Sequence, residues 1–144
     1  LITMWHFLEH CYSPAESLKK THSLLSKKGK LVIEVPRLDS LTYKIYKDKW
    51  PGVQAPQHTV MFDKSHFIKM IEKSGFRVVK YLPYGAFPSY FYIFAGTYFK
   101  IFGKGMNLDK IIAPYFLGQL LLKPFLFFEK RLNLAMQTIV CEKI

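Results

Sequence analysis

Acidic and imidazole side chains gather near the start of the chain. Glu9 and His10 follow the apolar run 1–5, and His6 stands three residues before Glu9. A further histidine, His58, lies in a proline-bearing stretch much later in the sequence. Histidine titrates close to neutral pH, so it can accept or donate a proton during a reaction. His58 and His10 are therefore the candidate catalytic residues.

Each of these residues also has a structural interpretation. His58 could instead hydrogen-bond its loop to a sheet, and His10 could cap or pack beside the helix that follows it. A nucleophilic pair of His10 with Cys11 is not expected, because adjacent side chains rarely point at each other. Trp50 either anchors its loop in the core or offers an aromatic platform to a substrate.

The first elements follow a strand–helix–strand order. Residues 1–5 form a short apolar run typical of a buried parallel strand. The sequence Ser-Pro-Ala-Glu at 13–16 combines a capping box with a proline at the first helical position, which predicts a helix start. Gly29 predicts the end of that helix. The β-branched run 31–35, closed by Pro36, predicts a second strand parallel to the first.

The middle of the chain predicts a short helix at 41–46 and a long loop through 50–58, and loops of this length tend to be functional. A second helix is expected from Asp63, its N-cap, to Gly75, its stop. The runs 76–81 and 135–143 predict two more strands. The aromatic and aliphatic stretch 88–132 predicts helices broken at Gly103, Gly105, Pro114 and Pro124.

Several motifs occur in a fixed order: Leu-Glu-His at 8–10, Lys-Lys-Gly-Lys at 27–30, Trp-Pro at 50–51, Pro-Gln-His at 56–58 and Ser-Gly-Phe at 74–76. Together they resemble the second half of a class I S-adenosylmethionine-dependent methyltransferase, of the small-molecule group with Leu-Glu-His after the fourth strand. The resemblance implies an α/β fold: the C-terminal half of a doubly wound Rossmann-like sheet, with a helical insertion before the last strand.

The resemblance also implies a domain plan and a set of site residues. Residues 1–144 would be one partial domain, with an α/β core at 1–84 and 133–144 and an aromatic-rich insertion at 85–132. The family's contacts, carried over to this sequence, assign the methionine part of the cofactor to Met4, Trp5 and His6, and they imply that Glu9 faces the substrate or stiffens the strand end. Trp50 and His58 are candidate substrate contacts because the loop that carries them should cross the mouth of the pocket.

A metal ion is not expected. In the related ubiquinone-type O-methyltransferases, the positions equivalent to His6, Glu9 and His10 look like magnesium ligands, but the first of them is a glutamate there. Magnesium prefers oxygen ligands, so His6 suits it poorly.

Two features of the family lie outside this sequence. The glycine-rich loop that wraps the cofactor and the acidic residue that holds its ribose would both precede Leu1, and neither is found in the 144 residues. The glycines at 103 and 105 are no substitute, because they do not sit between a strand and a helix. We therefore expect a fragment that binds S-adenosylmethionine weakly and is inactive alone, with a second subunit or an upstream half as its partner.

The charge of the chain favours an anionic partner. Twenty-one basic residues against 10 acidic ones leave a net charge of +11. No nucleic-acid-binding module is recognised, so an apolar or anionic small molecule or an anionic lipid surface is favoured over nucleic acid. The basic, aromatic insertion could be a lid, an interfacial membrane helix or a packed subdomain. A noncatalytic interaction or membrane-surface module is therefore the alternative function.

The remaining features favour the cytoplasm, with the inner face of the membrane as an alternative. Cys11 and Cys141 are far apart and show no zinc-like spacing, as expected in a reducing compartment. The sequence does not begin with a signal-peptide pattern. The longest uncharged stretch, 81–99, is interrupted by prolines and glycines, which favours peripheral contact over a transmembrane span.

Overall fold

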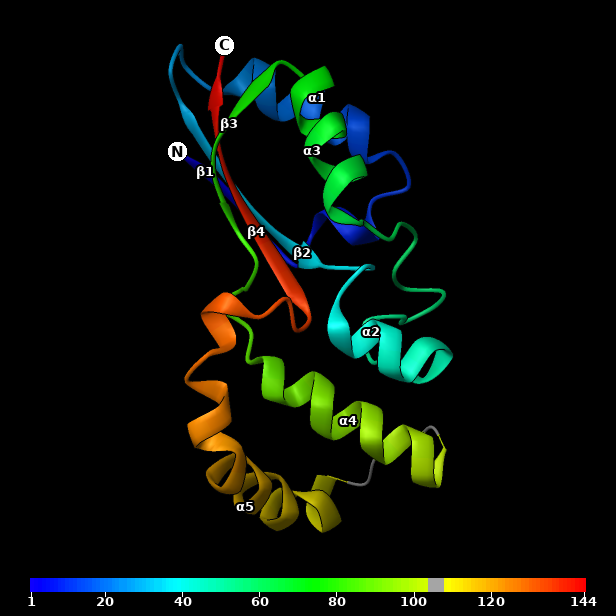
Figure 1. Ribbon diagram of the computed structural model, residues 1–144. Coiled ribbons are helices and arrows are strands. Elements are labelled where there is room, and N and C mark those ends of the chain that lie inside the picture. The colour runs from blue at the N-terminus through cyan, green and yellow to red at the C-terminus, as the bar shows by residue number, and fades with distance from the viewer. Residues whose placement is uncertain (104–107) are drawn as a thin grey trace.

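The computed structural model describes residues 1–103 and 108–144. Its strands and helices are shown in Figure 1. In chain order they are β1 (Ile2–Trp5), η1 (Leu8–His10), α1 (Pro14–Leu24), β2 (Lys30–Pro36), α2 (Leu41–Tyr46), η2 (Lys47–Lys49), α3 (Lys64–Lys73), β3 (Phe76–Leu82), α4 (Ser89–Phe102), α5 (Leu108–Leu126), η3 (Glu129–Arg131) and β4 (Met136–Lys143), where η marks a 3₁₀ helix.

The described strands form one sheet in the order β1-β2-β4-β3. β1 and β2 are parallel, with Thr3 opposite Val32. β4 is antiparallel to both of its neighbours, with Ile139 opposite Ile33 of β2. The sheet confirms the predicted parallel pair, the antiparallel closing strands and the α/β fold class. It also places the last strand of the chain between β2 and β3.

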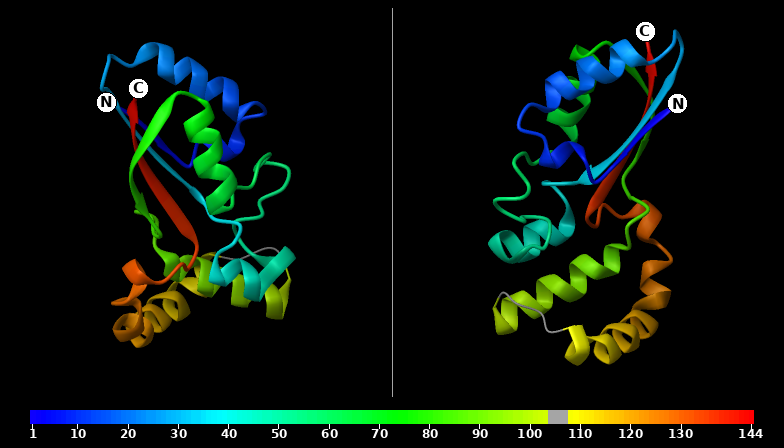
Figure 2. Two further views of the ribbon diagram at one scale, coloured as in Figure 1. Left: turned by 45° about the horizontal axis from the view of Figure 1, so that its top comes forward. Right: turned by 180° about the vertical axis from the view of Figure 1, so that it is seen from behind.

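The main core lies between the sheet and the two helices α1 and α3, which cover the same face (Figure 2). Leu31 and Ile33 of β2 are fully buried, as are Leu18 of α1 and Phe67 and Ile71 of α3. Burying each such side chain contributes about 1.5–3 kcal/mol. This packing holds the parallel strands and therefore fixes where their carboxyl ends lie.

The prediction that α1 continues to Gly29 is wrong. The helix ends at Leu24, and the left-handed residue of the following turn is Lys28, with φ 62°. Leu25 leaves the helix and is only 5% exposed, because it turns into the core. Lys143 of β4 donates hydrogen bonds to the carbonyls of His22 and Leu25, at 2.6 and 2.7 Å. A distant cation therefore replaces the local glycine cap. The Ser13 side chain makes no capping hydrogen bond, while Pro14 does occupy the start of the helix.

The predicted ends of α3 are confirmed. The Asp63 side chain accepts a hydrogen bond from the His66 amide at 3.0 Å. Gly75 follows the helix with φ 87°, a left-handed conformation that favours glycine. The short helix α2 is also confirmed over residues 41–46.

A second layer lies beyond the end of the sheet at which β1 and β2 finish (Figures 1 and 2). Tyr46 of α2 bonds the Ile93 carbonyl and the Thr97 hydroxyl of α4, at 3.1 and 2.7 Å. A smaller core of Trp50, Tyr92, Ala135 and Met136 joins this layer to β4. The insertion is thus held to the α/β core through α4.

The predicted breaks in the insertion are partly wrong. Gly103 does end α4, with φ 79°. Pro114 and Pro124, however, lie inside α5, which continues from Leu108 to Leu126. Both prolines are exposed, and water can bond the carbonyls that a proline ring leaves free. The predicted break at Gly105 lies outside the described residues.

Leu18→Ala is expected to lower the free energy of unfolding by about 2–5 kcal/mol, because it leaves a cavity under a fully buried side chain. Leu24→Ala is the matched control: it lies in the same helix, is 67% exposed and should change stability by less than about 0.5 kcal/mol. Urea denaturation measures both variants. Equal losses would contradict this description of the core.

Candidate functional site

The candidate site begins where β1 ends. His6 follows the strand and adopts a left-handed backbone with φ 49°, which is uncommon for a residue with a side chain. Its amide still donates to the Glu34 carbonyl of β2 at 3.2 Å, so the chain leaves the sheet in one abrupt turn. Leu8, fully buried, then anchors η1 against the core. The turn brings the side chains of His6, Glu9 and His10 to the carboxyl ends of the parallel strands.

His6 lies between two buried carboxylates. Its Nε2 is 3.2 Å from Glu34 and its Nδ1 is 3.5 Å from Glu9. Each of the two glutamates is only 1% exposed. The interaction with the Glu34 carboxylate, and then with the more distant Glu9 carboxylate, raises the pKa of His6 to about 9. His6 is therefore an imidazolium at neutral pH, and it links the end of β1 to β2.

Glu34 connects this ion pair to the insertion. Its carboxylate accepts hydrogen bonds from the amides of Ala86 and Phe87, at 2.7 and 3.3 Å, and from the Thr138 hydroxyl at 3.3 Å. Burial raises the pKa of Glu34, but the bonds from His6 and the two amides outweigh it and hold the pKa below its usual value. A Cβ on Gly85 would lie 2.7 Å from this carboxyl group, so only glycine allows the approach.

Sequence reasoning missed Glu34. A charged residue inside the apolar run 31–35 is the signal that could have identified it, because a buried charge needs a partner.

The loop 51–60 is fixed to η1. The carbonyl oxygen of Glu9 accepts hydrogen bonds from the amides of Thr59 and Val60, at 2.9 and 3.2 Å. Trp50 anchors the start of the loop: it is 2% exposed, and its indole N–H donates to Thr42 at 2.8 Å. These contacts bring His58 back to the end of β1.

The loop places His58 beside His10, with the two ring centroids 4.7 Å apart. His10 Nδ1 lies 2.9 Å from the Gln57 carbonyl, and His58 Nδ1 lies 2.7 Å from the Gly52 carbonyl. A carbonyl oxygen only accepts, so each Nδ1 carries the proton and donates it. In the neutral rings, the lone pair of each Nε2 is left for another partner.

The structure brings most of the sequence-predicted site residues together. Glu9, His10 and His58 offer atoms that all lie within 4.8 Å of one another. Of the three residues assigned to the cofactor, Met4 is buried in the main core, Trp5 is 49% exposed and His6 joins the carboxylates described above. The roles of these residues in binding a cofactor or a substrate stay predictions.

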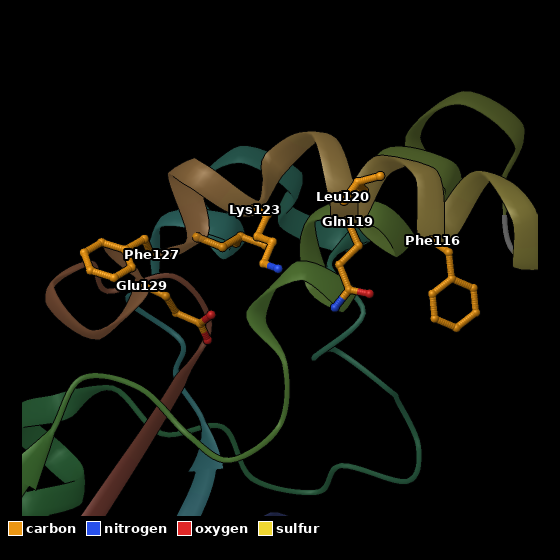
Figure 3. A pocket seen from close by; sticks show the side chains of 7 residues that line it. Phe116, Gln119, Leu120, Lys123, Phe127 and Glu129 are labelled. Atoms are coloured by element: carbon orange, nitrogen blue, oxygen red, sulfur yellow. The ribbon is translucent and has the colours of Figure 1, made fainter.

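A separate hollow lies away from this cluster. A shallow, mostly apolar cavity of about 700 Å³ runs along α5 and η3. Figure 3 shows its lining, with Gln119, Lys123 and Phe116 extending to the same side of α5. It holds no group of titratable side chains comparable to the histidine cluster, so we take the cluster, and not the hollow, as the candidate site for chemistry.

Comparisons with known proteins agree with this fold. Residues 1–81 match a family described as a methyltransferase domain. The structure resembles the crystal structure of the [4+2]-cyclase SpnF with a TM-score of 0.54 at 8% sequence identity. The match covers 98% of this chain and 49% of that chain, so this chain spans about half the length of SpnF. No curated protein sequence matches the chain.

The charged state of His6 should appear in the pH dependence of stability. Its pKa of about 9 in the folded chain exceeds its ordinary value of 6.5, so its contribution is complete below pH 6.5 and is lost as pH rises through 9. The stability difference between the wild-type chain and His6→Gln should therefore shrink over that range. Denaturation at a series of pH values measures it, and an NMR titration midpoint for His6 at or below 6.5 would contradict it.

Proposed function

Because the chain belongs to the methyltransferase domain family, we propose that it forms the C-terminal part of an S-adenosylmethionine-dependent methyltransferase acting on a small molecule. The observation that carries this proposal is the cluster of Glu9, His10 and His58 beyond the carboxyl end of β1. Ligands of open α/β sheets bind at this edge. Titratable side chains at this edge can bind a polar methyl-acceptor group of the substrate and exchange a proton with it.

The exposed residues at the end of β1 suit part of the cofactor. About half of the Trp5 residue surface and a third of the His6 side-chain surface are exposed, next to the strand that lies at the edge of the described sheet. Met4 supports this strand end from the core side. When bound, S-adenosylmethionine supplies an activated methyl group. The 144 residues contain no glycine-rich loop for the rest of the cofactor, so we propose that this chain alone binds it weakly and transfers no methyl group.

The protein's contribution to the reaction is positioning and proton transfer. The loop 51–60 holds His58 against His10, so the acceptor is bound between fixed groups and not in open solvent. Either Nε2 can take the proton that an oxygen or nitrogen acceptor loses, because each Nδ1 proton is already donated to a carbonyl. Glu9 and the loop that Trp50 anchors complete the substrate side of the site.

Methyl transfer is tested with the full product of the gene that encodes this chain. It should transfer a labelled methyl group from S-adenosylmethionine to one of a panel of small hydroxyl and amine acceptors. His10→Ala or His58→Ala should lower kcat by about 100-fold or more. His66→Ala is the matched control, since His66 is 80% exposed on α3, and it should leave kcat unchanged within about twofold.

The contrary outcome is also defined. SpnF is a [4+2]-cyclase, so the fold alone does not decide the reaction. A full-length product that binds S-adenosylmethionine without forming S-adenosylhomocysteine on any acceptor class would remove the methyltransferase proposal. Tight binding of the cofactor by the 144-residue chain in calorimetry would remove the proposal that this chain is insufficient.

A second candidate function, peripheral membrane contact, is supported by α5. Six of its apolar side chains are more than half exposed: Ile112, Phe116, Leu117, Leu120, Leu121 and Phe125. Lys123, Lys130 and Arg131 stand exposed at the end of this surface. Figure 1 and the right panel of Figure 2 show α5 outermost, with α4 between it and the sheet. Within the described residues, no helix has the length and apolar content needed to cross a bilayer. An apolar face flanked by lysines suits the surface of an anionic bilayer and a lipid-borne acceptor.

Vesicle sedimentation tests this second candidate. The chain should sediment with phosphatidylglycerol-containing vesicles and less with neutral ones, because its basic residues are attracted to anionic headgroups. Leu120→Glu combined with Leu121→Glu should weaken binding at least about tenfold. Ile45→Glu, on α2 and 51% exposed, is the control and should bind like the wild type. Equal recovery of the wild-type chain in all supernatants would overturn the candidate.

A further inference from the structure

The Glu9 carboxylate lacks the contacts that a buried charge needs. Glu9 is 1% exposed, and neither carboxylate oxygen accepts a hydrogen bond from any residue that the structure describes. His6 Nδ1 is 3.5 Å from Glu9, and the same ring also contacts Glu34 through its Nε2, at 3.2 Å. A buried carboxylate without hydrogen bonds is costly, so a further positive or donating group is expected beside it.

In their neutral forms, the neighbouring His10 and His58 are oriented to bind an ion through Nε2 and not to donate a hydrogen bond from it. Their Nδ1 protons are held by the carbonyls of Gln57 and Gly52, which leaves each Nε2 as an acceptor. A ring whose second nitrogen donates to a backbone carbonyl is the usual arrangement of a metal-binding histidine, because the bond fixes both the tautomer and the ring orientation. A neutral imidazole held in this way cannot supply the donor that Glu9 lacks.

We infer that Glu9, His10 and His58 form a binding site for a divalent transition-metal ion such as zinc, cobalt or manganese. One ligand atom from each residue lies within 4.8 Å of the other two, close enough to surround a single ion after small side-chain adjustments. Two imidazoles and one carboxylate favour these metals over magnesium. His10 is exposed, so the outer side of the ion is open to water or to a further ligand.

This site differs from the one weighed in the sequence, where no metal was expected because His6 is a poor ligand. In the structure both ring nitrogens of His6 face carboxylates, and His58 from the loop 51–60 takes the third position. The inference rests on the proposed function for its role: the open side of the ion would bind the oxygen or nitrogen acceptor. In the metal-loaded site both imidazoles would hold the ion, so the proton that the acceptor loses would pass to water on the exposed side and not to His10 or His58.

Metal binding is measured on the chelator-treated chain itself, without any methyl-transfer assay. One equivalent of Co²⁺ should bind and give visible absorption bands, and Zn²⁺ should bind at the same site in calorimetry and raise Tm. Glu9→Gln and His58→Ala should each weaken binding at least about tenfold. Glu9→Gln keeps the size of the side chain, and circular dichroism verifies that each variant is folded.

The control is His66→Ala, which removes a carboxylate–imidazole pair outside the proposed site, Asp63 with His66, and should leave the affinity unchanged. The inference is overturned if the wild-type chain binds no ion, if Glu9→Gln and His58→Ala bind as tightly as the wild type, or if His66→Ala alone removes binding. Because binding is read directly, loss of the metal site and loss of the proposed methyl transfer are separate results.

Discussion

The interaction on which the site depends is the contact of one imidazolium with two buried carboxylates. His6 joins Glu9 and Glu34, and Glu34 in turn accepts the amides of Ala86 and Phe87. The end of β1, strand β2 and the start of the insertion therefore meet at Glu34 and at its partner, the charged side chain of His6. Two carboxylates at this depth would repel each other without it. The left-handed backbone of His6 is retained because the side chain is held on both of its nitrogens.

Helix α4 lies between the α/β core, which carries the polar candidate site, and α5, which carries the exposed apolar side chains. One side of α4 faces the smaller core, to which its residue Tyr92 contributes, and α2, whose Tyr46 hydrogen-bonds α4. On its other side lies α5, whose apolar side chains remain open. Phe87, at the head of α4, also packs edge-on against His6, with ring centroids 5.3 Å apart. The α5 surface and the Glu34 contacts therefore belong to the same insertion, because the amides of Ala86 and Phe87 that bind Glu34 are among its first residues.

Local sequence patterns predicted the elements whose boundaries depend on nearby residues. They failed where a boundary or a site residue depends on contacts with distant parts of the chain. The parallel pair, α2 and the ends of α3 follow from apolar runs and from caps at Asp63 and Gly75. The end of α1 does not, because it depends on burial of Leu25 and on a lysine more than a hundred residues away. In the site, Glu9, His10 and His58 could be chosen by residue type. Glu34 could not, because its partners lie on a turn about fifty residues later, where only folding brings them together.

The position of β4 has a consequence for how the chain is made. Strand β4 follows β1, β2 and β3 in the chain but lies between β2 and β3, so those two strands have no neighbour on that side until β4 has been synthesised. The strands of the sheet therefore cannot pair one after another in chain order. The hydrogen bond from Lys143 to the His22 carbonyl, at the end of α1, also cannot form before β4 is present. The β2–β4 and β3–β4 ladders, which make up most of the strand pairing, can therefore form only once β4 is present, through contacts between residues far apart in the sequence. Until then the edge of β2 that will pair with β4 keeps its backbone groups unpaired, and such an edge can pair with another chain.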